Sequence, residues 1–454
     1  MTEDFIYDLA GKLIFSMNRF FPSQIFINML FFSGSAAILN KYEQNDIFIR
    51  ASLTFFLGFL FCVFGKLIHE KFEKTFLKFK INQKNLKIIL LICGLVPFFF
   101  IYNFRSIYFK VKYVGFVLSI ISAIFYISSL YNFSECFTYL FLRITLIGII
   151  SFLIMIASCT TLYIFNLIKN FSNFAPYKIN LLFWFTVIFL TFGTIAIPVN
   201  GSKPKESDFF WKAILKFLLP IYFILFFIFT LYGIKIVFIQ GTEFFENFEI
   251  LLSVLFSIYI FLTFILMQYE NDKKSVKIFL NLGGYLNFIL IFIQFFALNQ
   301  TITRYGMNSM KYIMIVESET MIITSLSAIF KKRKYVKHIP LLFSFAILFI
   351  TITPFNILDV PIREQNLRLV KILSENNMFE EKKIVPNSNI SQRNKEKISL
   401  YYKNIIHMGG KKLGILPIDN KDFENVFGFK FIEKYEIPKN IKKLDVKETY
   451  RYDF

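Results

Sequence analysis

The chain has 454 residues, of which 56% are hydrophobic, and its mean hydropathy is +0.55. This composition lies outside the usual range of soluble globular domains. The formal net charge of +20 would suggest a nucleic acid as partner. However, Lys and Arg gather in short loops between apolar runs, where they orient helices and contact anionic lipid headgroups. We therefore predict the lipid bilayer as a partner and exclude nucleic acid.

Several apolar runs are long enough to cross a bilayer, because about 20 helical residues span roughly 30 Å of hydrocarbon. The runs predict a mainly α fold, a polytopic transmembrane helical bundle of about eleven spans. In this prediction residues 1–20 form an amphipathic helix and residues 21–357 form the bundle. Residues 358–454 form a small C-terminal α+β domain outside the membrane.

The chain begins with an amphipathic pattern. Residues 5–20 place Phe5, Ile6, Leu9, Leu13, Met17 and Phe20 at helical spacing, which predicts a short helix on the membrane surface. The first span, 21–39, carries the small residues 33–37. Small residues let helix backbones approach closely in lipid, so we expect this face to pack against a neighbouring helix.

The other spans follow at short intervals. The third run, 88–102, contains Pro97 and is compatible with either a kinked span or a re-entrant segment. Trp184 in the sixth span is expected to anchor it at the membrane interface. The predicted spans after the first are 51–68, 88–102, 111–131, 144–168, 181–199, 217–239, 250–267, 278–298, 312–329 and 341–352.

The distribution of basic residues predicts the orientation of the chain. When loops are assigned alternately to the two sides, one set of loops holds twenty Lys and Arg and the other set holds eight. Because positively charged loops stay in the cytoplasm, the N-terminus is predicted inside and the C-terminus outside. We expect the chain in the inner (cytoplasmic) membrane of a bacterium.

The segment 358–454 differs from the rest in being polar, with 19 basic and 14 acidic residues. Residues 361–373 show a helical pattern. Ser391 is a candidate N-cap of a second helix, which Gly409 and Gly410 would end. The alternation of Phe429 and Phe431 in 429–436 predicts a strand. We expect a folded domain.

Two carboxylates fall inside a predicted span. Glu317 and Glu319 lie in the tenth span, and an ionisable residue there costs about 2.5–3.5 kcal/mol at the helix centre. Because the two residues are two apart, they point to different sides of a helix. They are candidates for a proton or cation site, for hydrogen bonding between helices, or for a shallow position.

Other chemical signals are sparse. Gly283 and Gly284 lie in the ninth span, where they either break the helix, as in transporter sites, or allow a tight packing contact. The four cysteines form no CxxC pair and the three histidines show no metal-ligand spacing. The sequence predicts no catalytic residue, no cofactor, no cofactor-binding residue and no metal ligand, so an enzyme is not the favoured hypothesis.

One segment carries a family resemblance. The stretch 301–312, Thr-Ile-Thr-Arg-Tyr-Gly-Met-Asn-Ser-Met-Lys-Tyr, resembles the bacterial membrane family known as domain of unknown function 4153. That family shows Arg-Ile-x-x-Tyr-Gly-x-Thr-x-x-Arg-Tyr before one of its last spans. Ile302, Tyr305, Gly306 and Tyr312 match this pattern, whereas Thr301, Asn308 and Lys311 stand where the family has Arg, Thr and Arg.

Two further stretches resemble the same family. Arg19-Phe20-Phe21-Pro22 is similar to its opening before the first span. Residues 353–356 with 365–369 are similar to its Gly-Pro-Phe segment and the Gln/Arg/Leu helix that follows the last span. The resemblance implies a many-spanning inner-membrane protein with a small C-terminal domain, and it implies no activity.

The Tyr-Gly segment also has a structural interpretation. A Tyr-Gly-x-Asn turn supplies an aromatic anchor at the membrane interface and a tight entry into the tenth span. On the outer side, it is in a position to dock the C-terminal domain. Tyr305, Gly306 and Tyr312 are therefore candidates for packing as much as for function.

The sequence supports two main functional hypotheses and a weaker third one. The favoured hypothesis is a non-enzymatic envelope protein whose bundle displays residues 358–454 to an envelope protein partner. The alternative is a secondary transporter or permease with a polar site in the middle of the membrane, built around Gly283, Gly284, Glu317 and Glu319. An enzyme acting on lipid-linked substrates is the weakest hypothesis, because no converging polar residues point to it.

Overall fold

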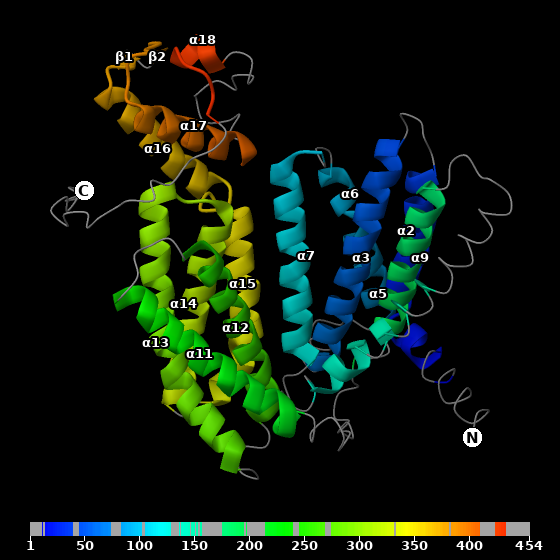
Figure 1. Cartoon of the computed structure of the whole chain (residues 1–454). Coiled ribbons are helices and arrows are strands. Elements are labelled where there is room, and N and C mark those ends of the chain that lie inside the picture. The colour runs from blue at the N-terminus through cyan, green and yellow to red at the C-terminus, as the bar shows by residue number, and fades with distance from the viewer. Residues whose placement is uncertain are drawn as a thin grey trace, which may run out of the picture. The chain divides into compact units, whose positions relative to one another are not determined.

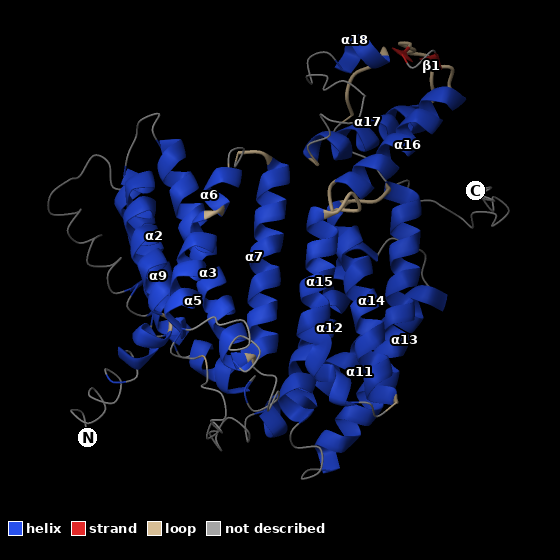
Figure 2. Ribbon diagram, turned by 180° about the vertical axis from the view of Figure 1, so that it is seen from behind, coloured by secondary structure: helices blue, strands red, loops and turns tan. Residues whose placement is uncertain are grey.

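The fold is taken from a computed structural model of the chain (Figures 1 and 2). Its contacts divide the chain into two compact units. Unit 1 comprises Met1–Gln300 and Ile313–Asn356, and unit 2 comprises Thr301–Tyr312 and Ile357–Phe454. The structure describes residues 11, 14–39, 45–73, 83–101, 105–128, 136, 138–145, 147–149, 151–152, 155–156, 175–194, 197, 214–238, 245–267, 274–330, 333–380, 383–408 and 423–432.

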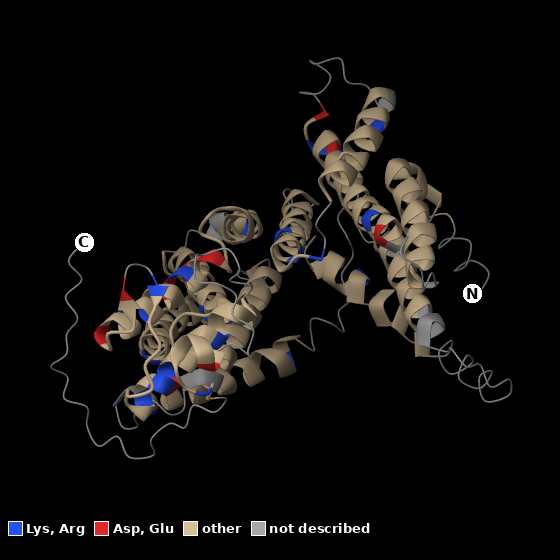
Figure 3. Cartoon of the chain, turned by 90° about the horizontal axis from the view of Figure 1, so that it is seen from above, with Lys and Arg blue, Asp and Glu red and all other residues tan. Residues whose placement is uncertain are grey.

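Among the described residues, 7 helices are long and apolar enough to cross a membrane. Most of the described ribbon carries neither acidic nor basic side chains (Figure 3). The chain is therefore a multi-pass integral membrane protein. The helices are α2 (Phe21–Leu39), α3 (Asn45–Lys71), α7 (Ile107–Ser128), α11 (Leu219–Phe238) with the preceding π-helical turn η2 (Ile214–Leu218), α12 (Phe245–Leu266), α13 (Lys274–Tyr305) and α14 (Ser309–Ile329).

Four further apolar helices are shorter, at 10–17 residues. They are Asn85–Phe100, Thr138–Ile149, Leu182–Thr191 and Val336–Ile352. Their described elements include α5 (Gln83–Leu95), α6 (Pro97–Phe100), α9 (Ala175–Gly193), the 3-10 turn η5 (Arg333–His338) and α15 (Ile339–Ile352). The described residues thus contain seven candidate spans of full length where the sequence predicts about eleven. Most of the predicted fifth span, 144–168, lies outside the described residues.

The third predicted run is broken at Pro97. α5 ends at Leu95, Val96 forms a turn, and α6 begins with Pro97 at its first position. Proline has no amide hydrogen and its ring clashes with the preceding helical turn, so a helix cannot continue through it undisturbed. The run therefore forms two helical pieces, as a kinked or re-entrant segment would.

The N-terminal segment is tied to α3. Residues 14–19 are helical with Ile14 and Phe15 exposed, whereas residues 1–10 of the predicted amphipathic helix lie outside the described part. Arg19 donates to both carboxylate oxygens of Glu70, at 2.9 and 2.6 Å, and its third nitrogen donates to the Ile197 carbonyl oxygen at 2.9 Å. This bidentate pair fixes the residues just before α2.

The small residues of α2 allow close packing against α9. A Cβ on Gly34 would collide with the ring of Phe183, so only glycine fits at this contact. Beside it, Trp184 donates through Nε1 to the Ser35 hydroxyl at 2.8 Å. The prediction that residues 33–37 pack against a neighbouring helix is confirmed.

Helices distant in sequence meet through small polar residues. Ser119 of α7 and Ser344 of α15 bring their hydroxyl oxygens to 2.7 Å, and the Ser122 hydroxyl donates to the Pro340 carbonyl oxygen at 2.6 Å. Gly115 leaves room for the side chain of Thr351. Such small and hydroxylated residues hold helices together where the hydrophobic effect is weak.

The core of unit 1 consists of two apolar clusters. One gathers side chains from α2, α3, α5, α7 and α9. The other gathers side chains from α11 to α15, and its largest members include Phe248, Phe256, Tyr259 and Phe279. The second cluster surrounds the buried amide side chains of Asn287 and Gln294 on α13.

Unit 2 has its own apolar core. It contains α16 (Asp359–Glu375), the antiparallel strands β1 (Phe379–Glu380) and β2 (Lys383–Ile384), α17 (Gln392–His407) and α18 (Phe423–Phe427). Leu369 and Leu373 of α16, Tyr402 of α17, and Phe423 and Phe427 of α18 are buried together. The helix predicted at 361–373 is confirmed.

The second predicted helix of unit 2 is also confirmed. The Ser391 hydroxyl accepts a hydrogen bond from the Asn394 amide at 3.2 Å, as an N-cap does. The apolar side chains Ile398, Tyr401, Ile405 and Met408 are buried along one side. Gly409 and Gly410 lie outside the described residues.

The predicted strand at 429–436 is wrong over residues 429–432, which form no strand, and the remainder lies outside the described residues. Phe429 and Phe431 instead pack their rings against Phe423, with centroids 5.5 and 5.2 Å apart. The Ile432 amide donates to the Ser399 hydroxyl at 3.2 Å. The alternating rings thus fill a core. The strands β1 and β2, each of two residues, were not predicted.

Candidate functional site

The segment between α13 and α14 turns tightly at Gly306. The Gly306 amide donates to the Ile302 carbonyl oxygen at 2.8 Å and so closes the last turn of α13. Gly306 has a φ of 76°, in the left-handed region that residues with a Cβ rarely adopt. A Cβ there would also collide with the side-chain amide of Gln365 on α16. Both the backbone conformation and this contact require glycine.

Gln365 binds the backbone of this turn. Its side-chain nitrogen donates to the carbonyl oxygens of Tyr305 and Met307, at 3.3 and 2.8 Å. The residue is fully buried, with 0% exposed. If the Gln365 side chain were removed, the two carbonyl groups would lose this hydrogen-bond donor, at a cost of about 1–3 kcal/mol for each buried group left unsatisfied. Gln365 therefore fixes the turn against α16.

The next turn of α16 extends this contact. The Met307 amide donates to a Glu364 carboxylate oxygen at 2.9 Å, and Arg368 pairs with the same carboxylate while donating to the Thr303 carbonyl oxygen at 2.9 Å. Burial by itself lowers the pKa of the Arg368 guanidinium. The charge and hydrogen bond of Glu364, together with Tyr401, outweigh burial and leave that pKa above its ordinary value.

Two polar residues complete the turn from its own side. Asn308 caps α14, because its side-chain oxygen accepts a hydrogen bond from the Lys311 amide at 2.9 Å. The Lys311 ammonium is buried and donates to the carbonyl oxygens of Thr301 and Gly306, at 3.2 and 3.4 Å. It also lies 5.3 Å from the centre of the Tyr305 ring. A cation here neutralises the negative end of the α13 dipole.

We name the residues 301–312, together with Glu364, Gln365 and Arg368, the Tyr-Gly junction. It brings together three of the predicted candidates, Tyr305, Gly306 and Tyr312, all within unit 2. Several of its polar contacts join a backbone group of the turn to a side chain of α16. The junction therefore joins the turn 301–312 to α16 within unit 2.

The glycine pair of α13 serves packing. α13 runs without a break from Lys274 to Tyr305, so the interpretation of Gly283 and Gly284 as a helix break is wrong. A Cβ on Gly283 would lie 2.9 Å from Cε2 of Tyr259, and one on Gly284 would lie 3.0 Å from the Cβ of Ala328. Both positions allow the neighbouring helices α12 and α14 to approach α13 closely.

The two glutamates of α14 have different surroundings. Glu317 is half-buried and accepts a hydrogen bond from the Ser257 hydroxyl of α12 at 3.3 Å, with Ser253 as a second hydroxyl partner. Glu319 is exposed. The spacing of two residues places them on different sides of the helix, as expected. Within the described part of the chain, Glu317 is the one of the two that is hydrogen-bonded to another helix.

Sequence reasoning missed two buried amides of α13. Asn287 and Gln294 are both 0% exposed inside the cluster of α11 to α15. The sequence does contain a pattern that indicates a polar side of this helix. Asn287, Gln294 and Thr301 recur every seven residues and therefore share one side of it. Gln365 and Arg368 were within reach too, since both belong to the segment that resembles the family's Gln/Arg/Leu helix.

Comparison of the whole chain with protein-family models, with curated proteins and with solved structures gives no match. The candidate sites are therefore interpreted from their geometry and chemistry.

Proposed function

We propose that this chain is a non-enzymatic protein of the bacterial cytoplasmic membrane. Its helical bundle presents unit 2 on the outer side, where unit 2 binds another protein of the envelope. The Tyr-Gly junction is the observation that carries this proposal. In this junction α16, the first helix of the domain, is hydrogen-bonded to the turn 301–312, which belongs to the same compact unit.

The orientation rests on two properties of the sequence. Eleven crossings would require the four shorter apolar helices of the described residues to cross the membrane together with the seven long ones. With eleven crossings, the loops with twenty basic residues face the cytoplasm and those with eight face outward. This arrangement leaves the N-terminus inside and unit 2 outside.

The resemblance to domain of unknown function 4153 supports the same proposal. The residues that carry it, above all Tyr305, Gly306 and the Gln365–Leu369 segment, fall on the two sides of the Tyr-Gly junction. A shared junction would give family members the same contact between this turn and the first helix of the C-terminal domain. We propose that the chain is a divergent relative of that family.

The exposed side of α16 is the surface that we expect the partner to contact. Leu367 is 66% exposed, more than any other large apolar side chain among the described residues of unit 2. Arg363 and Lys371 lie one helical turn before and after it and are also exposed. An apolar centre with a basic rim suits a partner that offers an apolar side chain among acidic ones.

The test places a photoreactive amino acid at position 367 of the full-length chain in intact cells. We expect ultraviolet light to join the chain to one protein of defined mass. Leu367→Asp should abolish capture when the photoreactive residue is moved to the exposed position Ile406, because a charge now occupies the apolar centre. Folding should be unaffected, since the side chain is mostly exposed.

A matched control places the same photoreactive residue at Ile323, which is 46% exposed on a membrane-spanning helix. It should capture lipid and no protein of that mass. Deleting residues 358–454 gives a second check through affinity purification. Co-purification of the same protein after that deletion would contradict the proposal.

Secondary transport remains the second candidate function. The observation in its favour is the set of polar side chains inside the α11 to α15 cluster, because buried amides and a carboxylate in a span are what substrate or ion pathways use. A permease would take up its solute in proteoliposomes, and Glu317→Gln should abolish uptake while Glu319→Gln leaves it intact.

A further inference from the structure

The carboxylate of Glu317 lies deep within a membrane-spanning helix. α14 starts at Ser309, so Glu317 is about 12 Å along the helix from its first residue at the rise of roughly 1.5 Å per residue. In hydrocarbon an isolated ionised carboxylate is unstable, and the group is either protonated or accompanied by a cation. The side chains around Glu317 therefore decide which of these two states it adopts.

Two hydroxyls on α12 face this carboxylate. Ser257, at an exposed position of α12, donates to it at 3.3 Å, and the half-buried Ser253, one helical turn earlier, is its second hydroxyl partner. Ser253 also accepts a hydrogen bond from the side-chain nitrogen of Gln294 on α13, at 3.2 Å. The same nitrogen reaches the Glu249 carbonyl oxygen at 3.4 Å. Three helices thus contribute to one chain of polar contacts.

The side-chain oxygen of Gln294 takes no part in these hydrogen bonds. Gln294 is completely buried, and within the described part of the chain its side-chain oxygen has no hydrogen-bond partner. The Asn287 side-chain oxygen, two helical turns away on α13, is in the same state. Buried acceptors without a donor are rare in folded proteins, so each of these oxygens is available to a water or a cation.

We propose that Glu317, Ser253, Ser257 and Gln294 form a binding site for a small monovalent cation, the proton included. A carboxylate, two hydroxyls and an amide oxygen supply one negative charge and several neutral oxygens. Hard cations take oxygen ligands of this kind. One charge on the protein balances one charge on the ligand, so no net charge remains within the membrane-spanning segment. The site holds whether or not the chain transports its cation.

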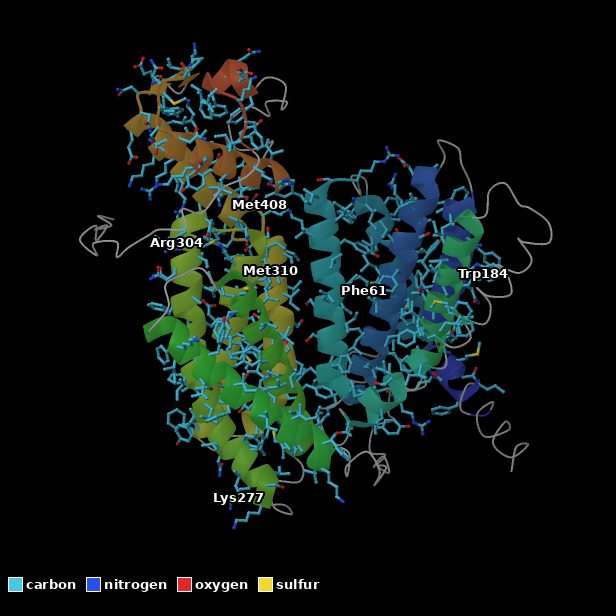
Figure 4. All side chains as sticks on the ribbon, viewed as in Figure 1. Phe61, Trp184, Lys277, Arg304, Met310 and Met408 are labelled. Atoms are coloured by element: carbon cyan, nitrogen blue, oxygen red, sulfur yellow. The ribbon has the colours of Figure 1, made fainter. Side chains whose placement is uncertain are left out.

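Several other ionisable groups accompany this site on the neighbouring helices. Tyr222 on α11 and Glu249 and Tyr259 on α12 are buried, whereas Glu319 on α14 is exposed. The cationic residues Lys277 and Arg304 lie toward the two ends of α13 (Figure 4). Glu249 is the group whose titration most needs separating from that of Glu317, because it belongs to the same polar chain.

The test uses dicyclohexylcarbodiimide, an apolar reagent that adds to protonated carboxyl groups, on the purified full-length chain in lipid nanodiscs. Peptide mass spectrometry reads the adduct on Glu317 and on Glu249 separately. pH is varied at constant choline chloride, and Na⁺ replaces choline at constant pH. We expect an adduct on Glu317 whose rate of formation falls with rising pH. Protection by Na⁺ at constant pH would identify Na⁺ as the ligand, and dependence on pH alone would identify the proton.

Variants test whether the site is built as proposed. Glu317→Gln should remove the adduct, and Glu319→Gln, at an exposed position of the same helix, should leave it unchanged. Ser253→Ala with Ser257→Ala should raise the half-protecting Na⁺ concentration about tenfold, or shift the pH midpoint of labelling upward by about one unit. The proposal is overturned if Glu317 takes no adduct at any pH, or if removing both hydroxyls leaves the dependence on pH and Na⁺ unchanged.

Discussion

Gly306 and Gln365 are two residues that depend on each other although 58 positions of sequence lie between them. The left-handed backbone at Gly306 exposes the carbonyl groups of Tyr305 and Met307, and the Gln365 amide binds both of them. Because glycine has no Cβ, that amide can lie directly against the turn. One contact therefore satisfies the turn's hydrogen bonds and seats α16.

Replacing Gly306 with alanine should loosen the Tyr-Gly junction. The strained φ contributes about 1–2 kcal/mol, and displacing the Gln365 amide adds a similar amount, so we expect a loss of about 2–4 kcal/mol in the local stability of the turn. Hydrogen exchange of the amides in 301–312, measured on the purified full-length chain, should accelerate by at least about thirtyfold. Ser388→Ala, at an exposed position of the same unit, is the control. An unchanged exchange rate in Gly306→Ala would show that Gln365 does not hold the turn.

The residues that depart from the family's pattern still have partners in the structure. Asn308 caps α14 as threonine also can, and Lys311 donates to two carbonyl oxygens where an arginine would have more donors to offer. Both side chains therefore have hydrogen-bond partners within the turn.

Among the elements, α13 connects the most features. It has 32 residues, which gives a length of about 48 Å and exceeds the roughly 30 Å of a hydrocarbon core. The glycine pair lies in its first half, the amides Asn287 and Gln294 follow, and the Tyr-Gly junction begins at its end. An uninterrupted helix thus joins a packing contact, a polar site and the first residues of unit 2.

Enlarging Gly284 should separate α13 from α14. Even a Cβ would lie 3.0 Å from the Cβ of Ala328 and 3.2 Å from the Ser325 carbonyl oxygen, so Gly284→Leu cannot be accommodated without moving a helix. We expect a loss of about 1–3 kcal/mol or more in the stability of the detergent-solubilised chain, seen as a lower unfolding temperature. The matched variant Gly193→Leu, on α9 with nothing within 4 Å of an added Cβ, should unfold close to wild type. Equal unfolding temperatures for the two variants would refute the packing role.

Elements with a strong local pattern could be predicted from the sequence. The long apolar runs and the helices α16 and α17 were found because apolar spacing and the Ser391 cap are properties of adjacent residues. The strand at 429–436 was mistaken because Phe429 and Phe431 alternate for another reason, the packing of their rings around Phe423. The hairpin of β1 and β2 is too short for an alternating pattern to be recognised.

The candidate sites depended on contacts that no local pattern contains. Glu317 was identified because a carboxylate in an apolar run is conspicuous, but its partners Ser253 and Gln294 come from two other helices. Gly306 is identified through a resemblance, and its requirement for glycine becomes clear from its φ of 76° and from the contact with Gln365. Sequence reasoning thus locates Glu317 of one site and Tyr305, Gly306 and Tyr312 of the other, and the tertiary structure supplies their partners.

At the scale of the whole molecule, the proposed function requires that the chain have a defined orientation in the membrane. Partner binding needs unit 2 to be outside the cell, and the basic loops need to lie in the cytoplasm. Both follow from an odd number of crossings, and a single miscounted span among the four shorter helices would reverse the side on which unit 2 lies. Orientation is therefore the claim on which the proposed function depends.

The accessibility of single cysteines measures this orientation directly. Ser388→Cys marks unit 2 and Phe330→Cys marks the loop after α14, both at exposed positions, in chains whose native cysteines are replaced by serine. A membrane-impermeant maleimide added to intact cells should label residue 388 at once and residue 330 only after the membrane is opened. If residue 330 is labelled in intact cells and residue 388 is protected, unit 2 lies in the cytoplasm, and the proposed display of an outer domain is contradicted.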